Sequence, residues 1–420
     1  MRDTNINEFT ENDKKYMRIA INLAQKAKGY TSPNPVVGAI IVRDGIIISK
    51  GYHKKAGCAH AEIEAINACS NKAALKGSRM YVTLEPCSIY GKTPPCVDAI
   101  IKHGFAEIVI GSTDFNPRIN GKGIEALQKA GIKVRAGLFR EEIKRQNEIF
   151  FKHITAASPF ICCKIASSID GKIAAKSSDS KWITSGQSRK IVQKIRQEYD
   201  CVVTGINTIL IDDPFLYPRK TSGNEEDFGS AMLPDIRKGK QFYRIVLDSG
   251  LKLPFDSNIA STANFVKTIV FTSNKISKDD FGHGAGYLSQ KNIDIVKVNS
   301  YQSENKKTLL LDLKEILGKL YSDYTITSAL LESGPALVTE FLKNNLIDKF
   351  VFFLAPKIIG GDSNFNMFSS LNINNIDDVL RINFETVKKI KTIGSGKGSA
   401  YTDIIIVAYP SGRDIKCLQE

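Results

Sequence analysis

Several features that mark other protein classes are missing from this sequence. No apolar run approaches the ~20 residues that a membrane-spanning helix needs, so we expect no membrane segment. Residues 1–12 are polar and mixed in charge, which argues against a signal or transit peptide. The eight cysteines follow no disulfide-scaffold spacing, and Cys162 and Cys163 are adjacent. We therefore expect reduced thiols and a cytoplasmic protein.

The chain also lacks any block of like charge, although its net charge is +14. Lysines are spread along the whole sequence rather than gathered in one segment. This distribution favours a lysine-rich surface with sites for phosphorylated small molecules over a nucleic-acid-binding patch. With 420 residues, 42% hydrophobic and 24% charged, the composition is that of a globular protein with two or three domains.

Histidine is scarce, with five in the chain, and one of them lies in a suggestive pattern. His60-Ala61-Glu62 is followed by Cys87 and Cys96, each preceded by proline. One histidine and two cysteines provide three zinc ligands and leave a fourth position for water, as in catalytic zinc sites. Glu62 is not needed as a ligand and can move protons beside the metal. This residue set is typical of zinc deaminases.

The first 155 residues alternate between helical and strand patterns. Apolar spacing predicts a helix over 13–28 with Asp13 as a candidate cap, and a hairpin through Asp44-Gly45. Further helices and strands alternate, which predicts helices on a mostly parallel sheet. We expect His60 and both cysteines at helix starts on one sheet edge. A helix over 141–153 then ends before Pro159, which places a domain boundary near residue 155.

The second half again alternates strands and helices. The clearest predicted elements are strands over 159–166, 201–205 and 326–331 and a helix over 187–198. No Gly-x-Gly-x-x-Gly follows a strand, so a Rossmann fingerprint is absent. Glu332-Ser333-Gly334-Pro335 predicts a strand-to-helix junction with free N–H groups. Residues 221–241 and 274–307 look like polar surface insertions.

The spacing of the cysteines distinguishes between branches of the deaminases. Nucleic-acid and nucleoside deaminases usually separate them by two residues, whereas the segment between Cys87 and Cys96 includes Gly91-Lys92-Thr93-Pro94-Pro95. This segment, with Pro33-Asn34-Pro35-Val36-Val37-Gly38, resembles the deaminase half of the bifunctional riboflavin-biosynthesis deaminase–reductase family. Stretches after residue 160 resemble the reductase half, so the resemblance covers about 9–410.

The resemblance implies an α/β protein with two enzymatic domains. Residues 1–155 would form a cytidine-deaminase-like zinc domain and residues 156–420 a dihydrofolate-reductase-like domain that uses NADPH. The first would hydrolytically deaminate 2,5-diamino-6-ribosylamino-4(3H)-pyrimidinone 5′-phosphate, and the second would reduce the ribosyl group to ribityl. We accordingly expect phosphorylated pyrimidine substrates, Zn²⁺ and NADPH as cofactors, a homo-oligomer, and no nucleic acid or membrane partner.

The resemblance also implies roles for individual residues. The catalytic residues would be Glu62 and Asp212, the latter in preference to Asp213, and the zinc ligands His60, Cys87 and Cys96. The substrate-binding residues would be Asn34, His53, Lys92, Asp114 and Asn116 in the first domain and Ser180, Arg196, Arg219 and Glu332 in the second. The residues bordering NADPH would be Ala166, Ser167, Trp182, Thr208 and Gly334.

Two positions depart from the family pattern. Ile89 stands where the family has a histidine of the substrate pocket, and isoleucine cannot make its hydrogen bonds. Cys58 lies just before the metal motif, where we expect it to pack or be exposed rather than bind metal. Two alternatives remain at this point: a reductase with an impaired or scaffold deaminase domain, and a nucleic-acid or nucleoside deaminase. The latter gives no use for residues 159–410.

Overall fold

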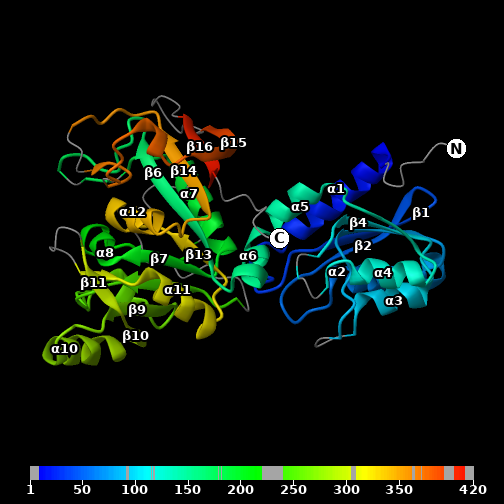
Figure 1. The fold of residues 1–420 in the computed structure, drawn as a ribbon, viewed down its shortest axis with the longest axis horizontal. Helices are drawn as coiled ribbons and strands as arrows, with labels where there is room; N and C mark the ends of the chain where they lie inside the picture. Colours follow the sequence, from blue (N-terminus) through cyan, green and yellow to red (C-terminus); the bar gives the residue numbers. More distant parts are fainter. Residues whose placement is uncertain are drawn as a thin grey trace. The chain divides into compact units, whose positions relative to one another are not determined.

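The computed structural model describes residues 9–90, 94–114, 116, 119–177, 179–180, 182–219, 240–303, 309–361, 365–369, 371–391 and 402–411. The chain divides into two compact units, Met1–Ala157 and Ser158–Glu420. Each unit has its own central sheet (Figure 1). None of the helices in the described ranges has the length and apolar character that crossing a lipid bilayer requires.

The first unit contains a five-stranded sheet between two layers of helices. Its elements are α1 (Glu11–Gln25), β1 (Gly38–Arg43), β2 (Ile46–Tyr52), α2 (Ala61–Ala68), η1 (Lys72–Leu75), β3 (Arg79–Leu84), α3 (Cys96–His103), β4 (Glu107–Ser112), α4 (Lys122–Lys129), β5 (Lys133–Ala136), α5 (Arg140–Gln146) and α6 (Glu148–Ala156). The strand order is β2-β1-β3-β4-β5, with β3, β4 and β5 parallel and β1 antiparallel to both neighbours. Helices α2, α3 and α4 lie on one face of the sheet and α1 and α5 on the other (Figure 1). Their apolar side chains pack against these two faces.

The hairpin prediction is confirmed, and the helix prediction is corrected at its start. Asp44 and Gly45 connect β1 to β2 with φ of 49° and 77°, the left-handed conformation that a tight hairpin turn requires. Thr10, not Asp13, caps α1. The Thr10 side chain accepts from the Asp13 N–H, and the Asp13 carboxylate accepts from the Thr10 N–H. Asp13 is buried in the first turn instead.

The buried Asp13 belongs to an ionic cluster beneath α1. Arg135 on β5 donates from Nη1 to Asp13 Oδ2 at 2.8 Å and from Nε to Glu107 Oε1 at 2.7 Å. The Tyr81 hydroxyl donates to Asp13 Oδ1 at 2.6 Å. Since the three charged groups are buried, these mutual bonds are what makes their burial tolerable. The cluster therefore joins α1 to three adjacent strands.

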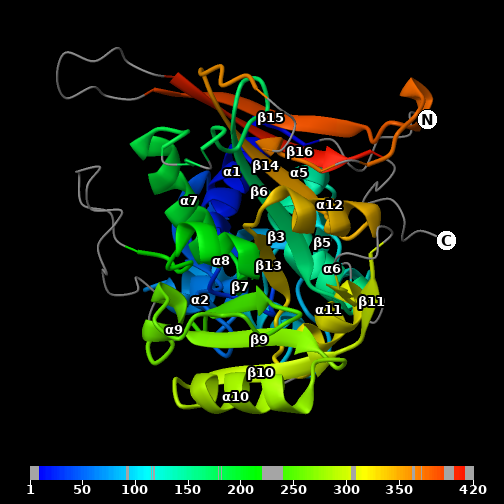
Figure 2. The same ribbon diagram turned by 90° about the vertical axis from the view of Figure 1, so that its left-hand side faces the viewer.

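The second unit is built on a nine-stranded sheet. Its elements are β6 (Phe160–Ser168), α7 (Gly186–Glu198), β7 (Cys201–Gly205), α8 (Ile206–Asp212), β8 (Tyr243–Leu247), α9 (Asn258–Ser261), β9 (Lys267–Ser273), α10 (Lys278–Ser289), β10 (Ile293–Val298), β11 (Ser300–Gln302), β12 (Leu309–Leu311), α11 (Leu313–Ser322), β13 (Ser328–Leu331), α12 (Pro335–Lys343), β14 (Lys349–Ala355), η4 (Ile376–Asp378), β15 (Ile382–Lys391) and β16 (Thr402–Pro410). The strand order is β10-β9-β8-β7-β13-β6-β14-β16-β15. Neighbouring strands are parallel along the run β10-β9-β8-β7-β13-β6-β14, and β16 and β15 add antiparallel pairs at one end (Figure 2).

One sequence prediction about this unit is wrong. The segment 274–307 is not a surface insertion, because its described part contains α10 and the edge strand β10, which pairs in parallel with β9. Polar residues on one side of an edge strand resemble a loop in sequence, whereas Ile293 and Val298 are buried. Residues 221–239 of the other predicted insertion lie outside the described residues. The main core lies between the sheet and helices α11 and α12.

Candidate active sites

The three predicted metal ligands of the first unit come together in space. The ligand atoms of His60, Cys87 and Cys96 lie within 4.8 Å of one another. His60 Nδ1 is 3.5 Å from Cys87 Sγ and 3.3 Å from Cys96 Sγ, and the Cys96 N–H points to Cys87 Sγ at 3.3 Å. The contact with the Cys96 side chain lowers the pKa of Cys87 below that of a free thiol, which favours a thiolate ligand.

The ligands are held by elements from one end of the sheet. His60 is the N-cap of α2, and Cys96 is the first residue of α3 behind the N-cap Pro95. Cys87 is not at a helix start, contrary to prediction, but in the loop that follows β3. Its position comes instead from the bond that it accepts from Cys96. Cys58 is not part of the cluster.

Glu62 lies in the first turn of α2 beside the ligands and is only 3% exposed. The pKa of Glu62 is raised to about 7, mainly because the carboxyl group is buried. A bound divalent cation would act in the opposite direction. A carboxyl group with a pKa near neutrality can both accept and return a proton, which is the task of a general acid–base residue.

Asn34 and His53 are joined next to this cluster. His53 Nδ1 lies 3.0 Å from the Ala59 carbonyl oxygen and therefore donates its proton there. Its Nε2 can then accept from Asn34 Nδ2 at 3.2 Å, and the ring meets that of His60 edge-on with centroids 5.5 Å apart. Burial lowers the pKa of His53, which favours this neutral form. The pair presents polar groups beside the metal ligands.

Glu85 is a residue of this site that sequence reasoning missed. Its buried carboxylate accepts the N–H groups of Asp114 and Gly121 on Oε2, both at 3.0 Å, and those of Gly123 and Ile124 on Oε1, at 2.9 and 3.3 Å. Asp114 in turn accepts the Asn116 N–H at 2.8 Å. Glu85 therefore connects the segment of Cys87 to the loop of Asp114 and Asn116. The sequence offers one indication of its importance, since Glu85 lies two residues before the predicted ligand Cys87.

The remaining predictions for this site fall on the loop before Cys96. Lys92 lies outside the described residues. Ile89 is 44% exposed, so the side chain that replaces the family histidine is not buried in the unit's core. The adjacent Tyr90 donates from its hydroxyl to Asp98 Oδ2 on α3 at 2.9 Å.

The second unit contains a cavity of about 1030 Å³ at the carboxyl ends of its parallel strands. This volume is at the upper end of the range for small-molecule sites, so a cofactor and a substrate can share it. Nine residues that the sequence predicted for this unit line it: Ala166, Ser180, Trp182, Arg196, Thr208, Asp212, Arg219, Glu332 and Gly334. Ser167 does not line it; the Ser167 hydroxyl is buried and donates to the Ser168 carbonyl at 3.0 Å.

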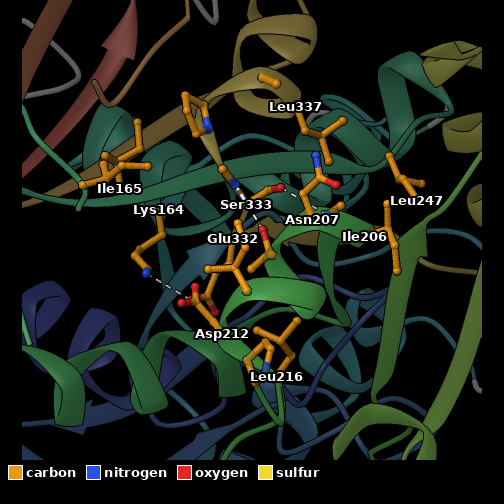
Figure 3. Close-up of a pocket in the computed structure, with 18 of the residues that line it drawn as sticks. Lys164, Ile165, Ile206, Asn207, Asp212, Leu216, Leu247, Glu332, Ser333 and Leu337 are labelled. Carbon is orange, nitrogen blue, oxygen red and sulfur yellow. Dashed lines mark hydrogen bonds and ion pairs between the residues drawn. The ribbon is translucent and has the colours of Figure 1, made fainter. Parts of the chain in front are cut away.

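A carboxylate held by two cations lies in the wall of the cavity. Glu332 accepts from Arg196 Nε at 2.6 Å and Nη2 at 3.1 Å. Lys164 Nζ lies 3.1 Å from Glu332 Oε2 (Figure 3). Burial alone raises the pKa of Glu332, but Arg196 and then Lys164 outweigh it and lower the value to about 2. The sequence analysis gave Lys164 no role, although a lysine within the apolar stretch 159–166 could have drawn attention to it.

The two adjacent aspartates after β7 have different partners. Asp212 lines the cavity (Figure 3). Its carboxylate accepts from the Ser180 hydroxyl at 2.9 Å. Asp213 accepts the Asn258 N–H at 2.8 Å, and its carbonyl accepts from Asn258 Nδ2 at 2.7 Å. Asp213 also has a φ of 40°. The Asp213 side chain is therefore bonded to Asn258, and Asp212 is the carboxyl group of the two that bonds to the predicted substrate-binding residue Ser180.

Two further predicted residues form the rim and one end of the cavity. Trp182 is 46% exposed, its ring lies 4.2 Å from the guanidinium of Arg189, and its carbonyl accepts from Lys357 Nζ at 2.7 Å. Gly334 is the N-cap of α12, and its N–H donates to Thr208 Oγ1 at 3.3 Å. The Trp182 ring and the start of α12 at Gly334 therefore both line the cavity.

Known proteins match both units. Residues 10–112 match the cytidine and deoxycytidylate deaminase zinc-binding region, and residues 159–396 match the RibD C-terminal domain. The riboflavin biosynthesis protein RibD of Aquifex aeolicus is 39% identical over 384 residues, which cover 91% of this chain and 96% of that protein. The chain belongs to the RibD family.

Other RibD proteins are similar to this chain over most of their length, in sequence or in structure. RibD of Escherichia coli is 36% identical over 351 residues, 84% of this chain and 89% of that protein. The structure of Acinetobacter baumannii RibD, form 1, has a TM-score of 0.74 and 30% identity, covering 96% of this chain and 99% of that chain. A Thermotoga maritima diaminohydroxyphosphoribosylaminopyrimidine deaminase/5-amino-6-(5-phosphoribosylamino)uracil reductase has a TM-score of 0.73 and 30% identity, covering 95% and 99%.

Membership in the RibD family confirms the predicted fold class and activities. The chain is an α/β enzyme of riboflavin biosynthesis with a cytidine-deaminase-like zinc domain followed by a reductase domain of the dihydrofolate-reductase type. Its cofactors are zinc and NADPH. The donor set of the first unit fits zinc, since two sulfurs and one imidazole nitrogen converge and leave a ligand position open. The volume of the second cavity fits a dinucleotide with a substrate.

Proposed function

We propose that the deaminase domain, residues 1–155, acts on 2,5-diamino-6-ribosylamino-4(3H)-pyrimidinone 5′-phosphate, and that the reductase domain, residues 156–420, acts on its product. The observation that carries the first half is the convergence of His60, Cys87 and Cys96 beside the buried Glu62. The observation that supports the second is a cavity lined by both carboxyl and cationic groups.

In the deaminase site, the chain's own residues would hold the ring and move protons. Zinc, held by His60, Cys87 and Cys96, would activate the attacking water. Glu62 would take a proton from this water and return it to the amino group that leaves as ammonia. Asn34 and His53 would orient the pyrimidine ring. Overall, water replaces the amino group and ammonia is released.

The loop residues of the deaminase site would complete substrate binding. Asp114 and Asn116 belong to the loop that Glu85 ties to the Cys87 segment. We propose that they contact the substrate's sugar or ring. Lys92 would supply a cation for the phosphate.

In the reductase site, NADPH would supply hydride to C1′ of the ribosyl group. Asp212, bonded to Ser180, would deliver the accompanying proton, so that the sugar opens to a ribityl chain and NADP⁺ is formed. Arg196, Glu332 and the phosphate-binding Arg219 would fix the substrate.

The nicotinamide side of the reductase site would be formed by other walls of the cavity. Trp182, Thr208, Gly334 and Ala166 would border the cofactor, with Ser167 behind them. Lys164, beside Glu332, would offer a further cation to the substrate.

We also propose a homo-oligomer that acts in the cytoplasm on small molecules without binding nucleic acid. The cysteine ligands must stay reduced to hold the metal, which suits a reducing compartment. The dispersed basic charge supports small phosphorylated substrates rather than a polyanion.

Two matched substitutions test the assignment of the two activities. Glu62→Gln keeps the size of the side chain but removes its basicity, so ammonia release should fall by about 10²–10⁴-fold. NADPH oxidation with substrate that is already deaminated should not change. Asp212→Asn should show the reverse pattern. Loss of both activities in either variant would contradict separate sites with these residues in these roles.

A further inference from the structure

Asn147 interrupts what the sequence suggests is one helix over 141–153. Helix α5 ends at Gln146 and α6 begins at Glu148, and Asn147 between them has φ of −109° and ψ of 20°. The asparagine is buried, at 3% exposed. A buried amide in a helix break requires hydrogen-bond partners, and the partners here lie in a distant segment of the chain.

The amide of Asn147 binds both main-chain groups of Val36. Asn147 Oδ1 accepts the Val36 N–H at 2.7 Å, and Nδ2 donates to the Val36 carbonyl at 3.1 Å. Nδ2 also lies 3.3 Å from the Ile143 carbonyl. One side chain thus takes the place of a neighbouring strand for residue 36, just before β1 begins at Gly38. The two bonds together fix both the position and the orientation of this peptide segment.

The segment fixed in this way carries the groups beside the metal ligands. Asn34 is two residues before Val36, and the Val37 carbonyl accepts the His53 N–H at 2.9 Å. The side chains of Asn34 and His53 are bonded to each other, and His53 is bonded to the Ala59 carbonyl next to His60. Because Asn34 Nδ2 donates to His53 Nε2, the amide oxygen of Asn34 is the group of this side chain that can accept from a donor on a bound ring.

We infer that Asn147 is a positioning residue for the deaminase reaction, which acts through Val36 to direct the Asn34 amide and the His53 ring at the pyrimidine. This inference rests on the proposed function, because it takes Asn34 and His53 to be the groups that hold the ring. Asn147 bonds to backbone rather than to the metal ligands, so its loss affects how the substrate is held. Zinc binding and the proton transfers of Glu62 remain.

The test compares Asn147→Asp, Asn147→Ala and a control, Asn22→Ala, which changes an exposed asparagine on α1. Aspartate keeps the acceptor for the Val36 N–H and is a favourable N-cap for α6, but it cannot donate to the Val36 carbonyl. Ammonia release is measured against substrate concentration and normalised to bound zinc. We expect KM to rise about ten-fold in both Asn147 variants, equivalent to about 1.4 kcal/mol. The kcat value and the zinc content should stay within about two-fold of wild type.

A double substitution checks the route of the effect. If Asn147 acts through Asn34, adding Asn147→Ala to Asn34→Ala should raise KM much less than Asn147→Ala does alone. Independent effects that multiply would overturn the inference.

Other outcomes are equally decisive. An unchanged KM in an active Asn147→Asp variant overturns the inference alone, as does a fall in zinc content and kcat with KM constant, which is the signature of a purely structural role. If Asn147→Ala does not fold, the aspartate variant decides the question. Absence of ammonia release from the wild type would overturn the proposed function and, with it, the inference.

Discussion

Glu332 offers a stringent test of the electrostatics of the reductase cavity. It is 6% exposed and is bonded to Arg196 and Lys164 at 2.6–3.1 Å. Replacing it with glutamine leaves two cations beside a neutral amide. Breaking a buried ion pair in this way typically costs about 3–5 kcal/mol of folding free energy. We expect Glu332→Gln to destabilise the second unit by roughly that amount at pH 7.

The pH dependence of this effect follows from the lowered pKa. The pKa of Glu332 falls from 4.5 to about 2 on folding, because the charges of Arg196 and Lys164 outweigh the cost of burial. This shift corresponds to about 3 kcal/mol that is fully present well above pH 4.5 and is lost as the pH falls toward 2. About 1 kcal/mol should already be lost at pH 4. Glutamine does not titrate, so the difference in unfolding free energy between wild type and Glu332→Gln should be about 1 kcal/mol smaller at pH 4 than at pH 7.

The chain provides its own probe for the measurement. Trp182 is the only tryptophan in the sequence and lines the cavity of the second unit. Urea unfolding followed by its fluorescence at pH 7 and pH 4 gives the two free energies for each protein. Glu340→Gln, which removes the carboxylate of a pair with Lys343 at 3.9 Å, is the control for a weak pair near the surface. If this difference in unfolding free energy is the same or larger at pH 4, Glu332 is not an ionised carboxylate paired with both Arg196 and Lys164.

Three other predictions concern the first unit. Removal of zinc by a chelator should abolish ammonia release and leave NADPH oxidation with deaminated substrate unchanged; loss of both activities would contradict a single zinc-dependent site. Glu85→Gln should turn an amide NH₂ toward two of the four N–H donors, one buried and one partly buried, and the loss of the buried bond should cost about 1–3 kcal/mol; an unchanged temperature of zinc release on heating would refute this prediction. Arg135→Leu removes the one buried cation that pairs with both Asp13 and Glu107 among the described residues and leaves these carboxylates the more exposed Arg79, so it should cost about 1.5–3 kcal/mol; an unchanged calorimetric transition of this unit would contradict that role.

The sequence was most informative where local chemistry determines structure. The spacing of His60, Cys87 and Cys96 predicted three residues whose ligand atoms the structure brings within 4.8 Å of one another, because few other residue sets serve zinc with an open position. Asp44-Gly45 identified the hairpin because few pairs adopt its turn. The choice of Asp212 over Asp213 came from the resemblance, and the bonds of Asp213 to Asn258 now support it.

The sequence was least informative where distant segments decide the outcome. The helix over 141–153 breaks because the Asn147 side chain bonds to Val36, more than 100 residues earlier in the chain. Glu85 and Lys164 were overlooked for the same reason, since the partners of Glu85 lie between Asp114 and Ile124 and the partner of Lys164 is Glu332. Local patterns also placed Cys87 at a helix start and residues 274–307 outside the sheet, where tertiary contacts gave a loop and an edge strand.

The most direct test of the account is an assay of the zinc-loaded protein with the diaminopyrimidinone ribosylamino phosphate, following ammonia and NADPH separately. The account predicts ammonia release first, then oxidation of one NADPH for each ammonia, with the exposed Ile89 tolerated. Oxidation of NADPH only when the substrate is supplied already deaminated would show that the first domain does not catalyse its step. If neither ammonia release nor NADPH oxidation is observed, both halves of the proposed function are contradicted.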